Sequence, residues 1–144
     1  MLDNVLSMFD DRKALVGKIK KAAYETNMPI YCEKYADLYK EMLGYLSDRD
    51  DKAVAAKEIA DIFCQRVYDG HAKNGRVKSG LILDLNFMMV YYFFPGLLLT
   101  GDENAATLAD AIRDKWNETF GCTISYGTYD FIMEGFKKKL FGLW

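Results

Sequence analysis

The feature that most constrains this chain is a nearly continuous apolar stretch from Leu81 to Leu99. A stretch of about 20 apolar residues must either cross a bilayer or be covered by the rest of the protein. Here it is interrupted by Asp84, by Asn86 and by the Pro95-Gly96 pair, and ionisable groups are costly inside a membrane. We therefore predict a buried central helix over about 77–94, with a kink or a stop at the proline, and no membrane span.

Apolar residues recur at steps of three and four along most of the chain, which is typical of helices that cover one side of a core. Runs that alternate between apolar and polar residues are few, so strands are not expected. The fold class predicted is all-α, with five to seven helices. The clearest stripe ends at Gly121 and comprises Ala105, Leu108, Ala109, Ile112, Trp116 and Phe120. Thr100 and Glu103 have the spacing of a capping box in front of it.

The other expected helices are less sharply bounded. One or two cover residues 2–24, with a break near Asp10 and Asp11. Another is capped by Asn27 or Met28, has Pro29 in its first turn and ends near residues 47–51, and the next runs over about 51–68. In that helix Ile62 is expected on the buried side, and Gly70 is expected to end the helix. A last helix is expected over about 128–141.

Length and composition favour one domain over residues 1–144. The chain is 51% hydrophobic, far too apolar to be disordered, and it contains no internal repeat and no Pro/Gly/Ser-rich linker. A domain of this size buries about 70% of the surface of its unfolded chain, so it needs no disulfide or metal for stability. No heptad pattern persists for three repeats, which predicts a compact irregular or orthogonal bundle instead of a coiled coil.

Charge and cysteine content exclude several classes of protein. Nineteen Lys and Arg oppose 21 Asp and Glu, and a net charge of −2 offers no general attraction for nucleic acid. Three scattered cysteines and the single His71 lack the spacing of a metal site, so no metal or cofactor is expected. Acidic residues precede the first basic residue, unlike a signal peptide, and the odd number of thiols fits a cytoplasmic protein.

The connection after the third long helix carries a local excess of positive charge. Arg66, Lys73, Arg76 and Lys78 stand against Asp69, and His71 is expected in the same exposed loop. The glycines of this loop are not followed by the Lys and Ser/Thr that a phosphate-binding loop requires. We interpret it as a solvated turn.

The apolar stretch itself contains the candidate ligand-binding residues. Asp84, Met88 and Tyr91 fall on one face of a helix, where an acid and a phenol hydroxyl beside apolar groups can orient a small molecule. In the simpler interpretation Asp84 lies near the wetter end of the helix and pairs with a Lys or Arg. Asn86, on another face, would then bond to a neighbouring helix.

Three functions remain open from the residues alone. Aromatics make up 15% of the chain, and those near its end surround the last helix instead of forming one stripe, which favours a non-catalytic protein that forms a homodimer or binds another protein. The interface residues predicted are Phe131, Phe141 and Trp144. The alternative is a bundle that binds an apolar or aromatic small molecule. An enzyme, with carboxylates such as Asp130 and Glu134 converging in a cleft, is the least favoured, and no catalytic residue stands out.

Overall fold

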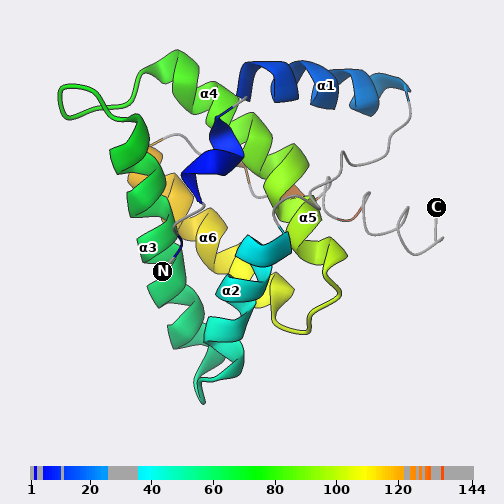
Figure 1. The fold of residues 1–144 in the computed structure, drawn as a ribbon, viewed down its shortest axis with the longest axis vertical. Helices are drawn as coiled ribbons and strands as arrows, with labels where there is room; N and C mark the ends of the chain where they lie inside the picture. Colours follow the sequence, from blue (N-terminus) through cyan, green and yellow to red (C-terminus); the bar gives the residue numbers. More distant parts are fainter. Residues whose placement is uncertain are drawn as a thin grey trace.

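The computed structural model describes residues 5–10, 12–25, 36–121 and 129–130, together with the single positions 2, 124, 125, 127 and 134. Within these residues the chain is helical apart from its connections and one isolated bridge between Lys73 and Arg76, so the predicted all-α bundle is confirmed (Figure 1). The elements in order are η1 (Leu6–Phe9), α1 (Arg12–Glu25), α2 (Ala36–Ser47), α3 (Lys52–His71), α4 (Ser79–Met88), η3 (Met89–Phe93), α5 (Phe94–Leu99) and α6 (Ala105–Phe120).

The helices pack around an aromatic interior. The most extensive contact is between α3 and α6, while α2 packs on α3 and α1 lies against α4 (Figure 1). Phe93 lies at the meeting point, because its ring is 5.4 Å from that of Tyr39 on α2 and 5.0 Å from that of Phe63 on α3. Burying large aromatic rings from several helices at one point is the main source of stability in such a domain.

The apolar stretch forms one continuous helix of 21 residues, Ser79–Leu99, made of α4, η3 and α5. Its length and composition would suit a membrane span, and 56% of its most apolar part is buried inside the protein. The burial is uneven along the helix. Residues from Leu85 to Leu97 are mostly buried in the core, whereas the first turns are more exposed, with Leu83 63% accessible. The buried central helix is therefore shifted along the chain from the predicted range of 77–94: residues 78–84 are exposed or half-buried, and burial continues past residue 94 to Leu97.

Of the kink or stop expected at Pro95, the stop does not occur, because the helix continues past the proline. A proline lacks the N–H that would bond the carbonyl of Tyr91, and its ring crowds that carbonyl. The chain widens before the proline into the π-helical turn η3, in which the N–H of Phe94 bonds the carbonyl of Met89, five residues earlier. A widened turn of this kind accommodates the missing donor and lets the helix continue to Leu99.

Two expectations for α3 are wrong, although its start is as predicted, with the Asp51 side chain accepting a hydrogen bond from the N–H of Val54. The helix continues through Gly70 to His71. A methyl group at Gly70 would lie 2.5 Å from a Leu6 methyl, so the glycine allows η1 to approach α3. Ile62, expected in the core, is 39% exposed, because it lies at the edge of the contact between α3 and α6.

The stripe predicted for α6 is confirmed, since all six of its apolar residues are buried. The predicted capping box is wrong. The Thr100 hydroxyl donates to the carbonyl of Leu97 at 2.7 Å and so completes the preceding helix. The turn that leads into α6 is instead stabilised by Asp102, whose carboxylate accepts a hydrogen bond from the N–H of Asn104 at 2.8 Å.

Gly121 ends α6 in the left-handed conformation, with φ of +62°, and a methyl group added at this position would meet no atom within 4 Å. We expect Gly121→Ala to destabilise the protein by about 1 kcal/mol, through backbone strain alone. Gly17 is the matched control, because it is exposed inside α1 and a methyl group there would have equally open surroundings. Gly17→Ala should stabilise by about 0.5–1 kcal/mol. Chemical denaturation of both variants tests this, and effects of equal sign would contradict it.

Candidate functional site

The three predicted ligand-binding residues differ in burial. Met88 is fully buried in the core, while Asp84 and Tyr91 are half-buried on the outer part of the helix. The ring of Tyr91 stacks on that of Phe87, with centroids 4.5 Å apart. None of the three surface pockets described below is lined by these residues.

Asn86 has the structural role expected of an amide in an apolar helix. Its side-chain oxygen accepts a hydrogen bond from the indole N–H of Trp116, which is fully buried on α6. A buried indole nitrogen that lacked such an acceptor would be costly, so this bond fixes the contact between α4 and α6.

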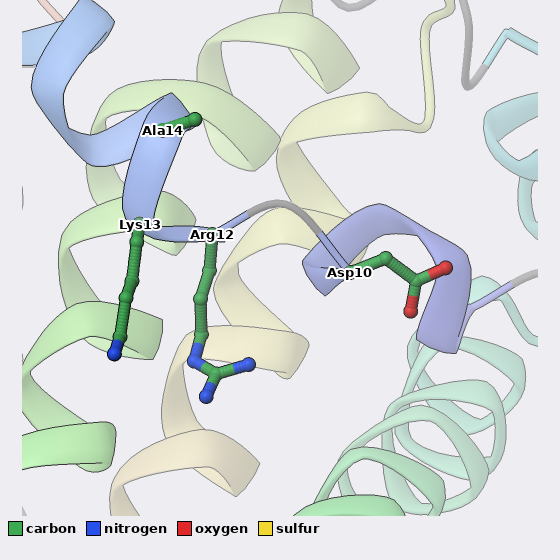
Figure 2. A pocket seen from close by; sticks show the side chains of 4 residues that line it. All are labelled: Asp10, Arg12, Lys13 and Ala14. Atoms are coloured by element: carbon green, nitrogen blue, oxygen red, sulfur yellow. The ribbon is translucent and has the colours of Figure 1, made fainter.

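A first pocket, of about 360 Å³, lies at the start of α1 (Figure 2). Arg12 and Lys13 extend side by side from the first turn, and Asp10 and Ala14 complete the lining. Among the buried polar side-chain atoms that the structure describes, Nε of Arg12 is the one without a hydrogen-bond partner. The pocket is cationic on one side and acidic on the other.

Two further pockets are open grooves. One, of about 470 Å³, runs between α3 and α6 and holds the exposed Ile62. Its lining consists of Asp61, Ile62, Gln65, Arg66, Asp69 and Lys115. The other, of about 490 Å³, lies between α2 and the connection from α5 to α6, with the buried Leu43 and the small Ala36 as its apolar residues. Both are lined mainly by polar or small side chains.

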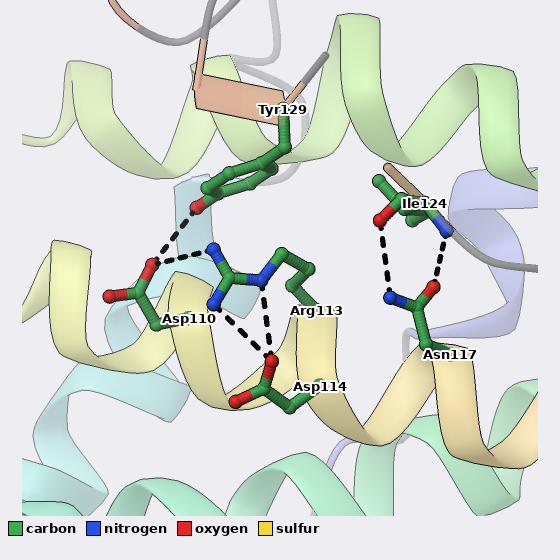
Figure 3. Close-up of polar contacts among 6 residues, drawn as sticks. All are labelled: Asp110, Arg113, Asp114, Asn117, Ile124 and Tyr129. Carbon is green, nitrogen blue, oxygen red and sulfur yellow. Dashed lines mark hydrogen bonds and ion pairs between the residues drawn. The ribbon is translucent and has the colours of Figure 1, made fainter. Parts of the chain in front are cut away.

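A polar cluster on the outer side of α6 fixes the chain that follows this helix (Figure 3). Arg113 pairs with Asp110 at 3.5 Å and with Asp114 at 3.3 Å. Its guanidinium lies 4.7 Å from the ring centroid of Tyr129, whose hydroxyl donates to Asp110 at 3.4 Å. Burial and the negative charge of Asp110 raise the pKa of the Tyr129 phenol. The ring of Tyr129 also meets that of Phe94 edge to face, so this cluster closes the core and has a structural role.

A second polar contact that holds the chain after α6 lies one turn further along this helix. The Asn117 side chain exchanges two hydrogen bonds with the backbone of Ile124, donating to its carbonyl at 3.2 Å and accepting its N–H (Figure 3).

Asp130 and Glu134, the carboxylates considered for an enzyme, are both exposed.

His71 and Cys64 are both structural. His71 is the last residue of α3, not part of an exposed loop: its Nδ1 donates to the carbonyl of Val67 at 2.8 Å, and its ring meets that of Phe9 edge to face. Cys64 is buried between α3 and α6, and burial raises the pKa of its thiol, which disfavours the reactive thiolate. In the described part of the chain, no three His, Cys, Asp or Glu residues are grouped to hold a metal ion.

The predicted interface residues Phe131, Phe141 and Trp144 lie outside the described residues, as do the expected helix start near Asn27 and most of the last helix expected over 128–141. The structure adds apolar surface that sequence reasoning missed. Among the described large apolar residues, Val54, Ile62, Leu83 and Leu99 are exposed, with Leu83 and Val54 the most accessible at 63% and 50%. The exposure of Val54 could have been predicted from the sequence, because Val54 lies on the same side of α3 as the charged residues Glu58 and Asp61.

Comparison of the chain with protein-family models, with curated proteins and with solved structures finds no match. The fold and the surface therefore define the class directly: an all-α bundle with a closely packed aromatic core and shallow, partly charged grooves.

Proposed function

We propose that this is a non-catalytic cytoplasmic protein that acts through association with a second copy of itself. The observation that carries the proposal is the exposed apolar pair on the outer side of α3, where Val54 is 50% and Ile62 39% accessible. The two residues are eight positions apart and fall about 80° from each other around the helix, so one partner surface can cover both. Covering such apolar surface is the usual driving force of association.

The groove beside Ile62 suits a self-complementary contact. It contains two acidic residues, Asp61 and Asp69, and two basic residues, Arg66 and Lys115. In a twofold dimer each patch meets its own copy, so acidic and basic groups from the two chains can pair reciprocally around a central isoleucine. A net charge of −2 gives little repulsion between copies.

The described interior supports association over ligand binding. Met88, one of the predicted ligand-binding residues, is enclosed in the core, and the three pockets described above are open to the surface. Ligand sites for apolar molecules are commonly enclosed and lined by apolar and aromatic side chains. A bundle that binds an apolar or aromatic small molecule is the alternative if the protein is monomeric.

Light scattering during size exclusion at micromolar concentration tests the proposal. The wild type should have the mass of two chains. Ile62→Glu should weaken association at least about tenfold, because a carboxylate would be placed in the apolar centre of the contact. Val54→Glu should act in the same direction with a smaller effect, since Val54 lies further from the groove.

Leu83→Glu is the matched control, because it places the same charge on another exposed apolar residue, on α4. It should leave the mass unchanged. A mass of one chain for the wild type would refute self-association. A dimer that Ile62→Glu preserves and that Phe131→Ser or Trp144→Ser dissociates would refute the α3 surface and assign the interface to the end of the chain.

A further inference from the structure

Charge is distributed unevenly between the two ends of the molecule. Residues 12–25 and 72–84 together contain eight Lys and Arg against two Asp and Glu, although the whole chain has more acidic than basic residues. The first segment forms α1, and the second contains the turn from α3 to α4 and the first turns of α4. Since α1 packs on α4, both segments lie at the same end of the bundle, at the top of Figure 1.

Among the side chains that the structure describes at this end, six basic ones are exposed, and we call them the basic end: Lys13, Lys18, Lys21, Lys73, Arg76 and Lys78. The three lysines of α1 fall within about 140° around the helix and therefore share one face. The turn residues Lys73 and Arg76 are held in place by hydrogen bonds between their backbones, at 2.8 and 3.2 Å. The basic side chains of α1 and of this turn therefore extend from an ordered backbone.

The basic end also exposes apolar side chains. Leu83, in the second turn of α4, is the most accessible of the described large apolar residues, and the neighbouring Leu81 and Ile82 are only half-buried. These residues follow Lys78 closely along the chain. Exposed aliphatic groups beside several lysines are typical of surfaces that rest on a membrane and place leucine at the boundary of the acyl chains.

The types of side chain at the basic end favour one class of anionic partner over others. Five of its six cations are lysines, which act as point charges on flexible stems and lack the fork with which arginine recognises individual phosphates or carboxylates. Its most exposed apolar residue is a leucine, whereas proteins that bind single-stranded nucleic acid use aromatic rings to stack on bases. These features fit a diffuse negative surface with an apolar layer beneath it.

We propose that the basic end binds the surface of a membrane that contains anionic phospholipids, with the lysines near the headgroups and Leu83 at the acyl boundary. The helix Ser79–Leu99 stays in the bundle, because its second half is buried against α2, α3 and α6 in the protein core. The residues involved differ from those of the proposed self-association, so each proposal can fail alone.

Co-sedimentation of the full chain with lipid vesicles tests the proposal. Vesicles of phosphatidylcholine with about 30% phosphatidylserine should bind the protein at low salt, and phosphatidylcholine vesicles should not. Binding should fall steeply between about 0.05 and 0.5 M salt, because the lysines are exposed to screening. Lys18→Glu/Lys21→Glu should weaken binding to the anionic vesicles at least about tenfold.

Leu83→Glu should also weaken vesicle binding at least about tenfold, while Leu99→Glu, its matched control at the opposite end of the same helix, should leave it unchanged. Lys73→Glu/Arg76→Glu repeats the charge test on the turn, and far-ultraviolet circular dichroism verifies that each variant is folded.

Three results would overturn the proposal: no binding to anionic vesicles, equal binding to neutral vesicles, or wild-type binding by the folded charge-reversal variants. Binding of an oligonucleotide that Leu83→Glu does not change, without binding to vesicles, would assign the basic end to nucleic acid and would also overturn it.

Discussion

Phe93→Ala should lower the free energy of unfolding by about 3–5 kcal/mol, the usual effect of truncating a fully buried phenylalanine. The side chain is completely buried at the centre of the bundle. Its ring lies 5.4 Å from Tyr39, 5.0 Å from Phe63 and 5.7 Å from Phe94, measured between centroids. Removing it would leave a cavity that α2, α3 and α5 all border, and close packing on three sides limits how far the cavity can collapse.

Two substitutions on the same helix are the controls for this prediction. The ion pair expected between Asp84 and a Lys or Arg is wrong for the described residues, among which the Asp84 carboxylate has no hydrogen-bond or ion-pair partner. Asp84→Leu should therefore change stability little, because the side chain is also only half-buried. Phe87→Ala should cost less than Phe93→Ala, since Phe87 is half-buried and stacks mainly on Tyr91. Urea denaturation ranks the three variants. If Asp84→Leu were as damaging as Phe93→Ala, Asp84 would belong to an essential site.

Trp116→Ala should have a comparably large effect, about 3–5 kcal/mol. Trp116 is fully buried on α6, and its ring lies 4.2 Å from Phe120 and 6.5 Å from Phe63. It also donates the hydrogen bond to Asn86 that joins α6 to the central helix. Truncation would therefore remove packing and a helix-to-helix bond together.

A double-mutant cycle separates these two contributions. Trp116→Phe keeps most of the ring and removes the donor, and Asn86→Leu removes the acceptor. The coupling between the two substitutions should be about 1 kcal/mol, the net value of one buried hydrogen bond. Unfolding free energies of the two single variants and the double variant measure it. Purely additive effects would show that the bond between Trp116 and Asn86 contributes nothing to stability.

The local pattern of apolar residues was sufficient to predict the fold class and several elements. The stripe from Ala105 to Phe120 is buried as expected, because steps of three and four place all its members on one side of a helix whatever that side contacts. The break near Asp10 and Asp11 and the amide role of Asn86 were predicted on equally local grounds. In each case the determining interaction lies within a turn of helix or follows from the cost of burying one polar group.

Tertiary structure decided what happens at Pro95 and Gly70. Proline favours a helix end when considered alone, yet burial of Phe93, Phe94 and Leu97 on both sides of it makes continuation through a π-helical turn the better solution. Glycine likewise favours a helix end, but Gly70 allows Leu6 to approach and α3 continues past it. Packing free energy here exceeds the local preference of a single residue.

The candidate surfaces depended on tertiary structure most strongly. Ile62 and Phe63 are adjacent apolar residues on α3, and the sequence alone placed both in the core. Only the positions of α2, α6 and the central helix leave Ile62 exposed while they bury Phe63. The same holds for Leu83 beside the buried Leu85. Periodicity determines which side chains share a face of a helix, whereas the number of neighbouring helices determines which faces remain open to a partner or a membrane, and that number is a property of the assembled bundle.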